Sequence, residues 1–253
     1  MNTDANTIGA VETSFAILES LKELNGARVT DVANHLEIPK STAHDHLQTL
    51  YRAECVVKEG DDYRVGARFL ELGGHARANM RLYRVAKEEV DKLADETGEQ
   101  ANLMIEEHGR GIFLHQAHGR DAVTADTYPG KRIYLQTTAL GKCILAHLPD
   151  ERVSSIIDRH GLPEITKNSI TTPEELTDEL EAVRERGYAI DDEERIEGMK
   201  CIAAPIIDRS DDVLGAVSVS GPTSRMQGQR FEEEIPSTVR RAANIIEVTV
   251  TYS

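Results

Sequence analysis

The chain has 253 residues, of which 40% are hydrophobic, and a formal net charge of −15 at pH 7. This length is enough for one or two domains with a substantial core. No apolar run approaches the ~18 residues of a membrane span, and the first ten residues lack the basic and apolar regions of a signal peptide. We therefore expect a cytoplasmic protein with no membrane partner.

The cysteine usage and the charge composition both suggest a cellular environment. Cys55, Cys143 and Cys201 lie far apart in the sequence and form no CxxC pair, which favours a reducing compartment without disulfides or a zinc ribbon. Acids are spread along the whole chain, arginine is about twice as frequent as lysine, and tryptophan is absent. This composition is typical of a salt-rich cytoplasm and indicates a halophilic archaeon; an ordinary acidic protein is the alternative.

The first 65 residues have the pattern of three short helices followed by a hairpin. Apolar residues recur at helical spacing in 8–26, with Val11 and Phe15 in that stripe, and again in 29–38 and 41–54. Two short strands around a Gly-Asp-Asp turn follow at 56–66. This order predicts a winged helix-turn-helix, in which the third helix enters the major groove of DNA.

The third helix and the wing supply polar and basic side chains that suit contacts with double-stranded DNA. Hydroxyl, amide and imidazole groups at the start of the helix reach base edges, and cations reach phosphates. The predicted DNA contacts are Lys40, Ser41, Thr42, His44, His46, Gln48, Arg52 and Arg64. Residues 1–75 hold seven Lys or Arg against twelve Asp or Glu, so a pure dimerisation module is the alternative.

The remainder of the chain predicts a linker helix and a second domain. A helical pattern covers 74–97: its early part is interpreted as a linker and its later part as the first helix of the second domain. Strands are expected at 101–107, 111–119 and 122–129, and helices at 137–148, 149–161, 172–187 and 231–250. Sheet, helices, sheet and helix in this order indicate an α+β fold.

A polar pocket is predicted between a hairpin and the start of a helix. Acids at 191–194 precede an apolar run that begins at Cys201, and a second run of small residues follows at 213–222. The two runs are expected to pair as antiparallel strands, facing a helix N-terminus that favours anions. The predicted contacts for a small organic acid are Thr138, Ala139, Leu140, Gly141, Asp191, Glu194, Cys201, Ser218 and Ser220.

Motifs for catalysis, cofactors and metals are absent from the sequence. It has no phosphate loop, dinucleotide fingerprint, metalloprotease motif or nucleophile elbow. Cys201 has no histidine partner nearby, so we assign no catalytic residue and no cofactor. His108, His115 and His118 have no cysteine or carboxylate at ligand spacing, so no metal is assigned, although a metal-sensing regulator remains an alternative.

The whole chain, from about residue 8 to 250, resembles the IclR family of transcription regulators. The specific match is Gly187, Asp191 and Glu194 followed by 201–203 and 206–208, and the segment 137–148 is similar to a second family element. The chain departs from the family pattern in three places. Ile207 replaces an aromatic residue or histidine, Gln136 replaces a histidine, and Asp45 replaces a frequent basic residue.

The resemblance implies a domain order and a function. It places a winged helix-turn-helix at 1–73, a linker helix at 74–97 and a GAF-like or profilin-like effector domain at 98–253, with an antiparallel sheet flanked by helices. Family members repress or activate catabolic genes as dimers or dimers of dimers, in response to an organic, sugar or aromatic acid. The family's ligand contacts correspond to Ala139, Leu140, Asp191, Cys201, Ser218 and Ser220.

One alternative function remains at this point. The C-terminal pocket could belong to a metabolite-binding protein or an enzyme, with the helical module serving only oligomerisation. The sequence shows no nucleophile together with an acid–base pair, and this disfavours the enzyme. The sequence predicts neither the identity of the effector nor the direction of the response.

Overall fold

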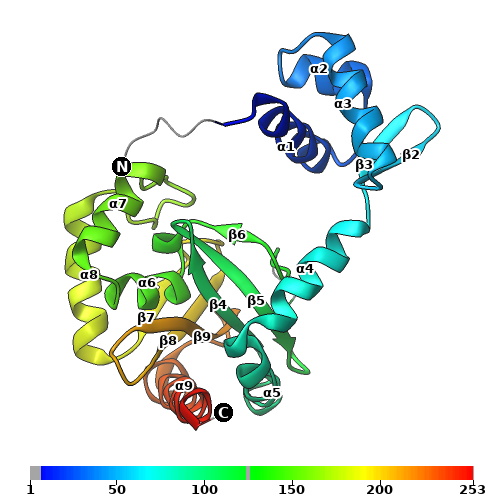
Figure 1. Ribbon diagram of the computed structural model, residues 1–253. Coiled ribbons are helices and arrows are strands. Elements are labelled where there is room, and N and C mark those ends of the chain that lie inside the picture. The colour runs from blue at the N-terminus through cyan, green and yellow to red at the C-terminus, as the bar shows by residue number, and fades with distance from the viewer. Residues whose placement is uncertain (1–6, 124–125, 253) are drawn as a thin grey trace. The chain divides into compact units, whose positions relative to one another are not determined.

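The computed structural model of the chain describes residues 7–123 and 126–252 (Figure 1). The chain forms two compact units, Met1–Ala76 and Arg77–Ser253, and together they have the α+β composition predicted from the sequence. Among the described residues, no helix is long and apolar enough to cross a membrane.

The first unit is a winged helix-turn-helix of three helices and a small antiparallel sheet. Its elements are α1 (Gly9–Glu23), β1 (Ala27–Arg28), α2 (Val29–His35), α3 (Lys40–Arg52), β2 (Val56–Glu59) and β3 (Asp62–Val65). The strands lie in the order β1-β3-β2. Ile17, Leu47 and Tyr63 are fully buried at its centre, so the apolar periodicity of the sequence does become the core.

The apolar face expected for α1 is only partly buried. Leu18 and Leu21 pack into the core, whereas the side chains of Val11 and Phe15 are 49% and 61% exposed. Helix α1 packs against α3 with the C-terminal part of its apolar stripe, and the N-terminal part of the stripe faces solvent. The helix predicted at 8–26 is present, but the first unit buries only part of its apolar stripe.

The helical stretch predicted for 74–97 is two helices, which corrects both its start and its continuity. Helix α4 spans Arg68–Asn79 and α5 spans Arg81–Thr97, with Met80 between them in an extended conformation (φ −75°, ψ 117°). None of the residues of α4 is buried. Helix α5 buries Leu82, Ala86, Val90, Leu93 and Ala94 in the core of the second unit.

The second unit is built on a six-stranded antiparallel sheet in the order β6-β5-β4-β9-β8-β7. Its strands are β4 (Gln100–Glu107), β5 (Arg110–His118), β6 (Arg132–Ile133), β7 (Ala189–Asp192), β8 (Met199–Ile207) and β9 (Val213–Pro222). The third strand was expected at 122–129, and this was wrong. Residues 122–123 and 126–129 are irregular, positions 124–125 lie outside the described residues, and the next strand is β6.

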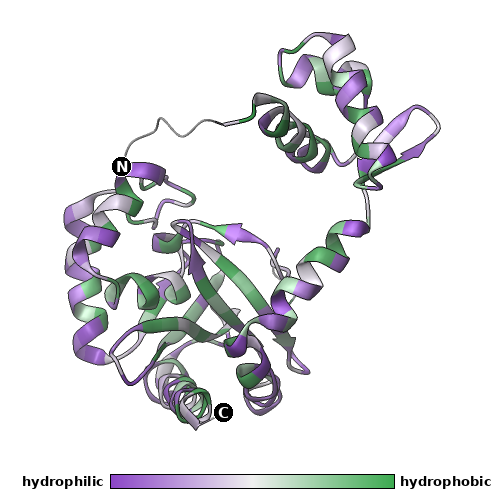
Figure 2. Cartoon of the chain, viewed as in Figure 1, coloured by the Kyte–Doolittle hydropathy of each residue, from purple (hydrophilic) through white to green (hydrophobic). Residues whose placement is uncertain are grey.

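Helices cover both faces of this sheet and create two cores (Figure 1). The elements not yet given are a short 3₁₀ turn (Leu135–Thr137), α6 (Ala139–Ala146), α7 (Asp150–His160), α8 (Pro173–Arg186), a π-helical turn (Arg230–Glu234) and α9 (Ile235–Tyr252). Helices α5 and α9 share one core with the sheet, and α6, α7 and α8 share the other. Figure 2 shows hydrophobic stretches on the strands between these helices.

The boundaries of α8 show how the local sequence positions the β7–β8 hairpin. The hydroxyl of Thr172 accepts a hydrogen bond from the backbone N–H of Glu175 (3.3 Å), and Pro173 occupies the first helical position. Gly187 ends the helix in the left-handed conformation (φ 75°), which a side chain disfavours. The chain then enters β7 directly.

Candidate functional site

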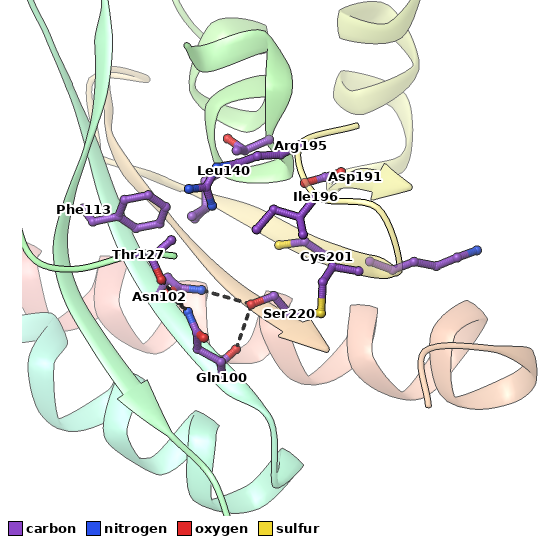
Figure 3. Close-up of a pocket in the computed structure, with 13 residues that line it drawn as sticks. Gln100, Asn102, Phe113, Thr127, Leu140, Asp191, Arg195, Ile196, Cys201 and Ser220 are labelled. Carbon is purple, nitrogen blue, oxygen red and sulfur yellow. Dashed lines mark hydrogen bonds between the residues drawn. The ribbon is translucent and has the colours of Figure 1, made fainter. Parts of the chain in front are cut away.

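A small cavity lies on the face of the sheet that α6 covers (Figure 3). The cavity volume is about 40 Å³, so the cavity suits a compact ligand. Its walls come from β4, β5, β8, β9, the start of α6 and the loop between β7 and β8. The lining residues are Gln100, Asn102, Phe113, Thr127, Thr138, Leu140, Asp191, Arg195, Ile196, Met199, Lys200, Cys201 and Ser220.

The register of four neighbouring strands brings the polar wall together. Strands β8 and β9 pair antiparallel, as the sequence predicted, with Cys201 opposite Ser220. Asp191 lies opposite Cys201, and Gln100 lies opposite Ser220. Because side chains alternate across a strand, Ile202 and Val219 face the other core while this row faces α6.

A hydrogen-bonded layer of amides and hydroxyls forms the floor of the cavity. Asn102 Nδ2 donates to the hydroxyls of Ser218 and Ser220, each at 3.3 Å. Gln100 Nε2 donates to Asn102 Oδ1 (2.8 Å) and to the Thr127 hydroxyl (3.0 Å). Figure 3 shows Gln100, Asn102 and Ser220 grouped at this side of the cavity. The layer offers polar partners to a ligand without offering a charge.

Asp191 is a buried carboxyl at the edge of the cavity. Its side chain is 7% exposed, and Oδ1 accepts a hydrogen bond from the backbone N–H of Glu194 (2.9 Å). Burial, reinforced by the neighbouring Glu194 carboxyl, raises the pKa of Asp191 to about 7. The raised pKa favours the protonated carboxyl, which can donate a hydrogen bond as well as accept one.

The loop between β7 and β8 places Arg195 over the cavity. The half-buried guanidinium lies 5.6 Å from the ring of Phe113 and donates from Nη2 to the carbonyl oxygen of Asp126 (3.0 Å). Burial lowers the pKa of Arg195. The loop is held by the N–H of Glu193, which donates to the O of Met199 (3.1 Å).

The start of α6 forms another wall. The hydroxyl of Thr138 accepts a hydrogen bond from the N–H of Gly141 (3.0 Å) and so caps the helix. Gly141 is required here because a Cβ atom would lie 2.0 Å from the carbonyl oxygen of Leu135. Thr138 and Leu140 line the cavity, whereas Ala139 and Gly141 are buried beside it.

Glu194 does not line the cavity, in contrast to its predicted role as an effector contact. Its Oε1 accepts a hydrogen bond from Nζ of the fully buried Lys142 (2.5 Å). Lys142 also lies 3.3 Å from Glu179, which pairs with Arg186 (2.7 Å). Burial raises the pKa of Glu194. This ion-pair network fixes the β7–β8 loop against α6 and α8, behind the cavity.

The structure thus brings some of the predicted effector contacts to the cavity and leaves others behind it. Thr138, Leu140, Asp191, Cys201 and Ser220 line the cavity; Ala139, Gly141, Glu194 and Ser218 do not. Burial raises the pKa of the Cys201 thiol, so the thiol is neutral and a poor nucleophile.

Several lining residues were missed by the sequence reasoning. Gln100 and Asn102 could have been found, because they are polar residues two apart that precede the apolar run of the strand. Phe113 and Thr127 gave no comparable signal. Arg195 follows the acid cluster directly, but its direction in a loop does not follow from any periodicity.

The predicted DNA contacts fall into two groups in the first unit. Lys40, Ser41, His44 and Arg52 are exposed along α3. The side chains of the other four are engaged or half-buried. His46 Nδ1 is bonded to the Ser14 hydroxyl (2.8 Å), Gln48 Nε2 donates to the Tyr63 hydroxyl (2.8 Å), Arg64 pairs with Glu59 (3.3 Å), and Thr42 is half-buried.

The three histidines singled out from the sequence do not converge. His115 Nε2 lies 2.7 Å from Asp91 Oδ1 on α5, and the backbone oxygen of His108 is bonded to the imidazole of His160 (2.9 Å). Across 7–123 and 126–252, no group of three or more His, Cys, Asp or Glu residues is arranged to hold a metal ion.

Two family models match the chain, in the same order as the two compact units. The model described as the IclR helix-turn-helix domain matches residues 10–60. The model described as the bacterial transcriptional regulator IclR C-terminal matches residues 74–248. Both halves of the chain are therefore accounted for by one kind of protein.

Individual relatives are similar to this chain over nearly its full length. A probable HTH-type transcriptional regulator, ArcR, of the halophilic archaeon Halobacterium salinarum is 38% identical over 251 residues, which cover 98% of this chain and 95% of that protein. A crystal structure of an IclR transcriptional regulator from Alicyclobacillus acidocaldarius superposes with a TM-score of 0.81 at 26% identity, covering 97% of this chain and 100% of that one. An IclR homologue from Microbacterium hydrocarbonoxydans, complexed with 4-hydroxybenzoate, shares the fold with a TM-score of 0.79 at 22% identity, covering 95% and 98%.

Proposed function

Because the chain belongs to the IclR family of transcriptional regulators, we propose that a small organic or sugar acid in its cavity controls its affinity for an operator. The chain is a regulator with a DNA-binding helix-turn-helix and an effector-binding domain, and not an enzyme. One observation carries the proposal. Cross-strand pairing on β7, β8, β9 and β4 places Asp191, Cys201, Ser220 and Gln100 side by side, on the face of the sheet that the start of α6 covers.

The exposed start of α3 supports the proposed contact with DNA. Lys40, at the first position of the helix, is placed to meet a phosphate, and Ser41 and His44 to meet base edges. We assign His46 and Gln48 the additional role of orienting α3, because their side chains are bonded to α1 and β3. Thr42, Arg52 and Arg64 complete the proposed contact set.

Size and polarity of the cavity support a compact acid as the effector. Helix α6 begins at the cavity with Leu140 in its first turn, and the first N–H groups of a helix favour an anion. Cys201 and Ser220 would contact the body of the ligand, and Asp191 one end. The homologue complexed with 4-hydroxybenzoate has the same fold, which supports a small acid as the effector.

Exposed apolar residues on α1 support a homodimer formed through the first unit, and the family resemblance extends this to a dimer of dimers. Ile8, Val11 and Phe15 are 70%, 49% and 61% exposed, and a second copy would cover them. We assign 1–73 to DNA binding, 74–97 to the linker and 98–253 to effector binding; residues 1–6 and 253 lie outside the described part. A protein that acts on the chromosome works in the cytoplasm.

Mobility-shift assays with the promoters of its own gene and its neighbours test the proposal. We expect preference for one of these promoters over random DNA at near-physiological salt, and a shift of the binding curve by a small acid. An effector changes DNA affinity only through different affinities for two states of the dimer. Equal binding to promoter and random DNA contradicts the proposal.

A further inference from the structure

Arg195 is a cation at the cavity that forms no ion pair within 4.0 Å with a described residue. A guanidinium carries five N–H donors, and this one makes a single hydrogen bond, to the carbonyl oxygen of Asp126. No carboxylate of a described residue forms an ion pair with it within 4.0 Å. Lys200, the other cation among the lining residues, is instead paired with Asp192 at 2.9 Å.

The surroundings make an unpaired cation unfavourable. Arg195 is half-buried beside Phe113 and Ile196, and moving a charge out of water without a partner costs free energy. Asp191 and Asp126 attract the guanidinium but form no ion pair with it within 4.0 Å, and Asp191 is already hydrogen-bonded to the backbone of the same loop. Glu194, the preceding residue, is bonded to Lys142 instead. Most N–H donors of Arg195 therefore have no partner among the described residues, and an anionic ligand would supply one.

We propose that Arg195 is the specificity-determining residue that selects the carboxylate of the effector, through a paired contact that two parallel N–H groups make with both carboxylate oxygens. This inference deepens the proposed function and rests on it. The guanidinium matches a carboxylate in geometry as well as in charge. Leu140, in the first turn of α6, lines the same cavity as Arg195 (Figure 3).

The opposite end of the cavity defines the second half of the ligand. There the floor consists of Gln100, Asn102 and Ser220, which are neutral donors and acceptors. Such groups suit a hydroxyl or oxo oxygen and leave a second carboxylate without a cation. The ligand class is therefore a small monocarboxylic acid with a hydroxyl or oxo group, rather than a dicarboxylate or a sugar phosphate.

The test is isothermal calorimetry on the full chain with matched charged and neutral probes. The probes are lactate and pyruvate, with lactamide as the uncharged counterpart and malonate as a dicarboxylate. The variants are Arg195→Gln, which removes the charge, and Arg195→Lys, which keeps the charge but loses the paired donors. Arg159→Gln, an exposed arginine on α7, is the matched control. Thermal unfolding of each variant checks that it folds.

We expect the wild type and Arg159→Gln to bind a monocarboxylate more tightly than lactamide. Arg195→Gln should weaken the binding of the monocarboxylate by about 10- to 100-fold, which is typical of a lost charge-assisted contact. Its affinity for lactamide should not change. Arg195→Lys should fall between the two. Equal affinity of Arg195→Gln and the wild type for the monocarboxylates overturns the inference. A wild-type preference for lactamide or malonate overturns it too. So does the absence of saturation by lactate and by pyruvate at millimolar concentration.

The design separates this inference from the proposed function. Promoter binding without any ligand is measured on the wild type and on Arg159→Gln, which should match because Arg159 lies outside the cavity. If the wild type fails to recognise DNA, the regulator proposal fails, while the ratio of acid to amide affinity still judges Arg195. If DNA binding is intact and the ratio is unchanged, only the role of Arg195 is wrong.

Discussion

Asp191 shows how a single buried carboxyl makes stability depend on pH. The unfolded group ionises near pH 3.8, whereas the folded group holds its proton up to about pH 7 because burial raises its pKa. Between these values the folded state binds the extra proton, so this group makes the free energy of unfolding fall as pH rises. Glu194, Lys142, Arg195 and Cys201 surround the carboxyl and modulate this effect.

The variant Asp191→Asn should remove this dependence. Asparagine does not ionise, and its amide oxygen still accepts the N–H of Glu194. We expect the stability of the variant relative to the wild type to increase by on the order of 1–3 kcal/mol between pH 5 and pH 8. Urea unfolding at the two pH values measures the difference. A difference that stays constant with pH contradicts the raised pKa.

At the residue scale, sequence patterns located the wall of the cavity but not its cation. Cys201 and Ser220 were predictable because strands alternate, and Asp191 because it belongs to a recognisable motif. The pair of Lys142 and Glu194 joins positions 52 residues apart, and no local rule connects them. Arg195 was missed because the direction of a loop side chain depends on tertiary contacts such as those of its loop with α6 and α8.

At the scale of elements, Lys142 joins α6 to the β7–β8 loop through a buried ion pair. Replacing Lys142 by Met leaves the Glu194 carboxylate buried without its partner, and we expect a loss of about 3–5 kcal/mol in the free energy of unfolding. The matched control is Lys92→Met, which removes an exposed pair with Glu89 and should cost less than about 1 kcal/mol. Urea unfolding measures both.

Adding Glu194→Gln to the Lys142→Met background removes the unpaired charge. The double variant should recover part of the lost stability, because a neutral amide is less costly to bury than a carboxylate. If the double variant is less stable than the single one, the loss does not come from an uncompensated charge.

Two helical glycines make a second matched pair. In α6, Gly141→Ala would place a Cβ 2.0 Å from the oxygen of Leu135, so we expect a loss of about 1–3 kcal/mol or more from overpacking. In α4, a Cβ on Gly74 would meet no atom within 4 Å, and Gly74→Ala should stabilise that helix by up to about 1 kcal/mol. Thermal unfolding compares the stability of the two variants with that of the wild type. If both variants are stabilised or both are destabilised, the two glycines do not differ in the way proposed.

The elements that were predicted wrongly have physical reasons. The stretch 122–129 alternates like a strand, but the described part of it is irregular, and the strand that pairs with β5 is Arg132–Ile133. The stretch 74–97 keeps helical spacing across Met80, whose extended backbone breaks the helix. In contrast, α8 and the β8–β9 pair were predictable, because a capped start, a glycine stop and continuous apolar runs are local signals.

At the scale of the whole molecule, the acidic charge should make DNA binding less sensitive to salt than is usual. Lys40, Arg52 and Arg64 are the proposed cations for phosphates, and Arg64 is already paired with Glu59. With these three in each subunit of a dimer, the slope of log K against log salt should be about −5 or shallower. Mobility shifts over a range of salt concentrations measure it, and a slope near −10 would show additional phosphate contacts.

The position of Arg195 on a loop also has a consequence for how this regulator diversifies. The strands and α6 supply most of the cavity wall, and they are tied into two cores. The proposed carboxylate-selecting cation belongs to residues 193–198, which connect two strands and carry little of either core. Exchange of this loop between paralogues could therefore give a sensor a new chemical preference while the scaffold stays intact, which makes the segment a natural starting point for building biosensors.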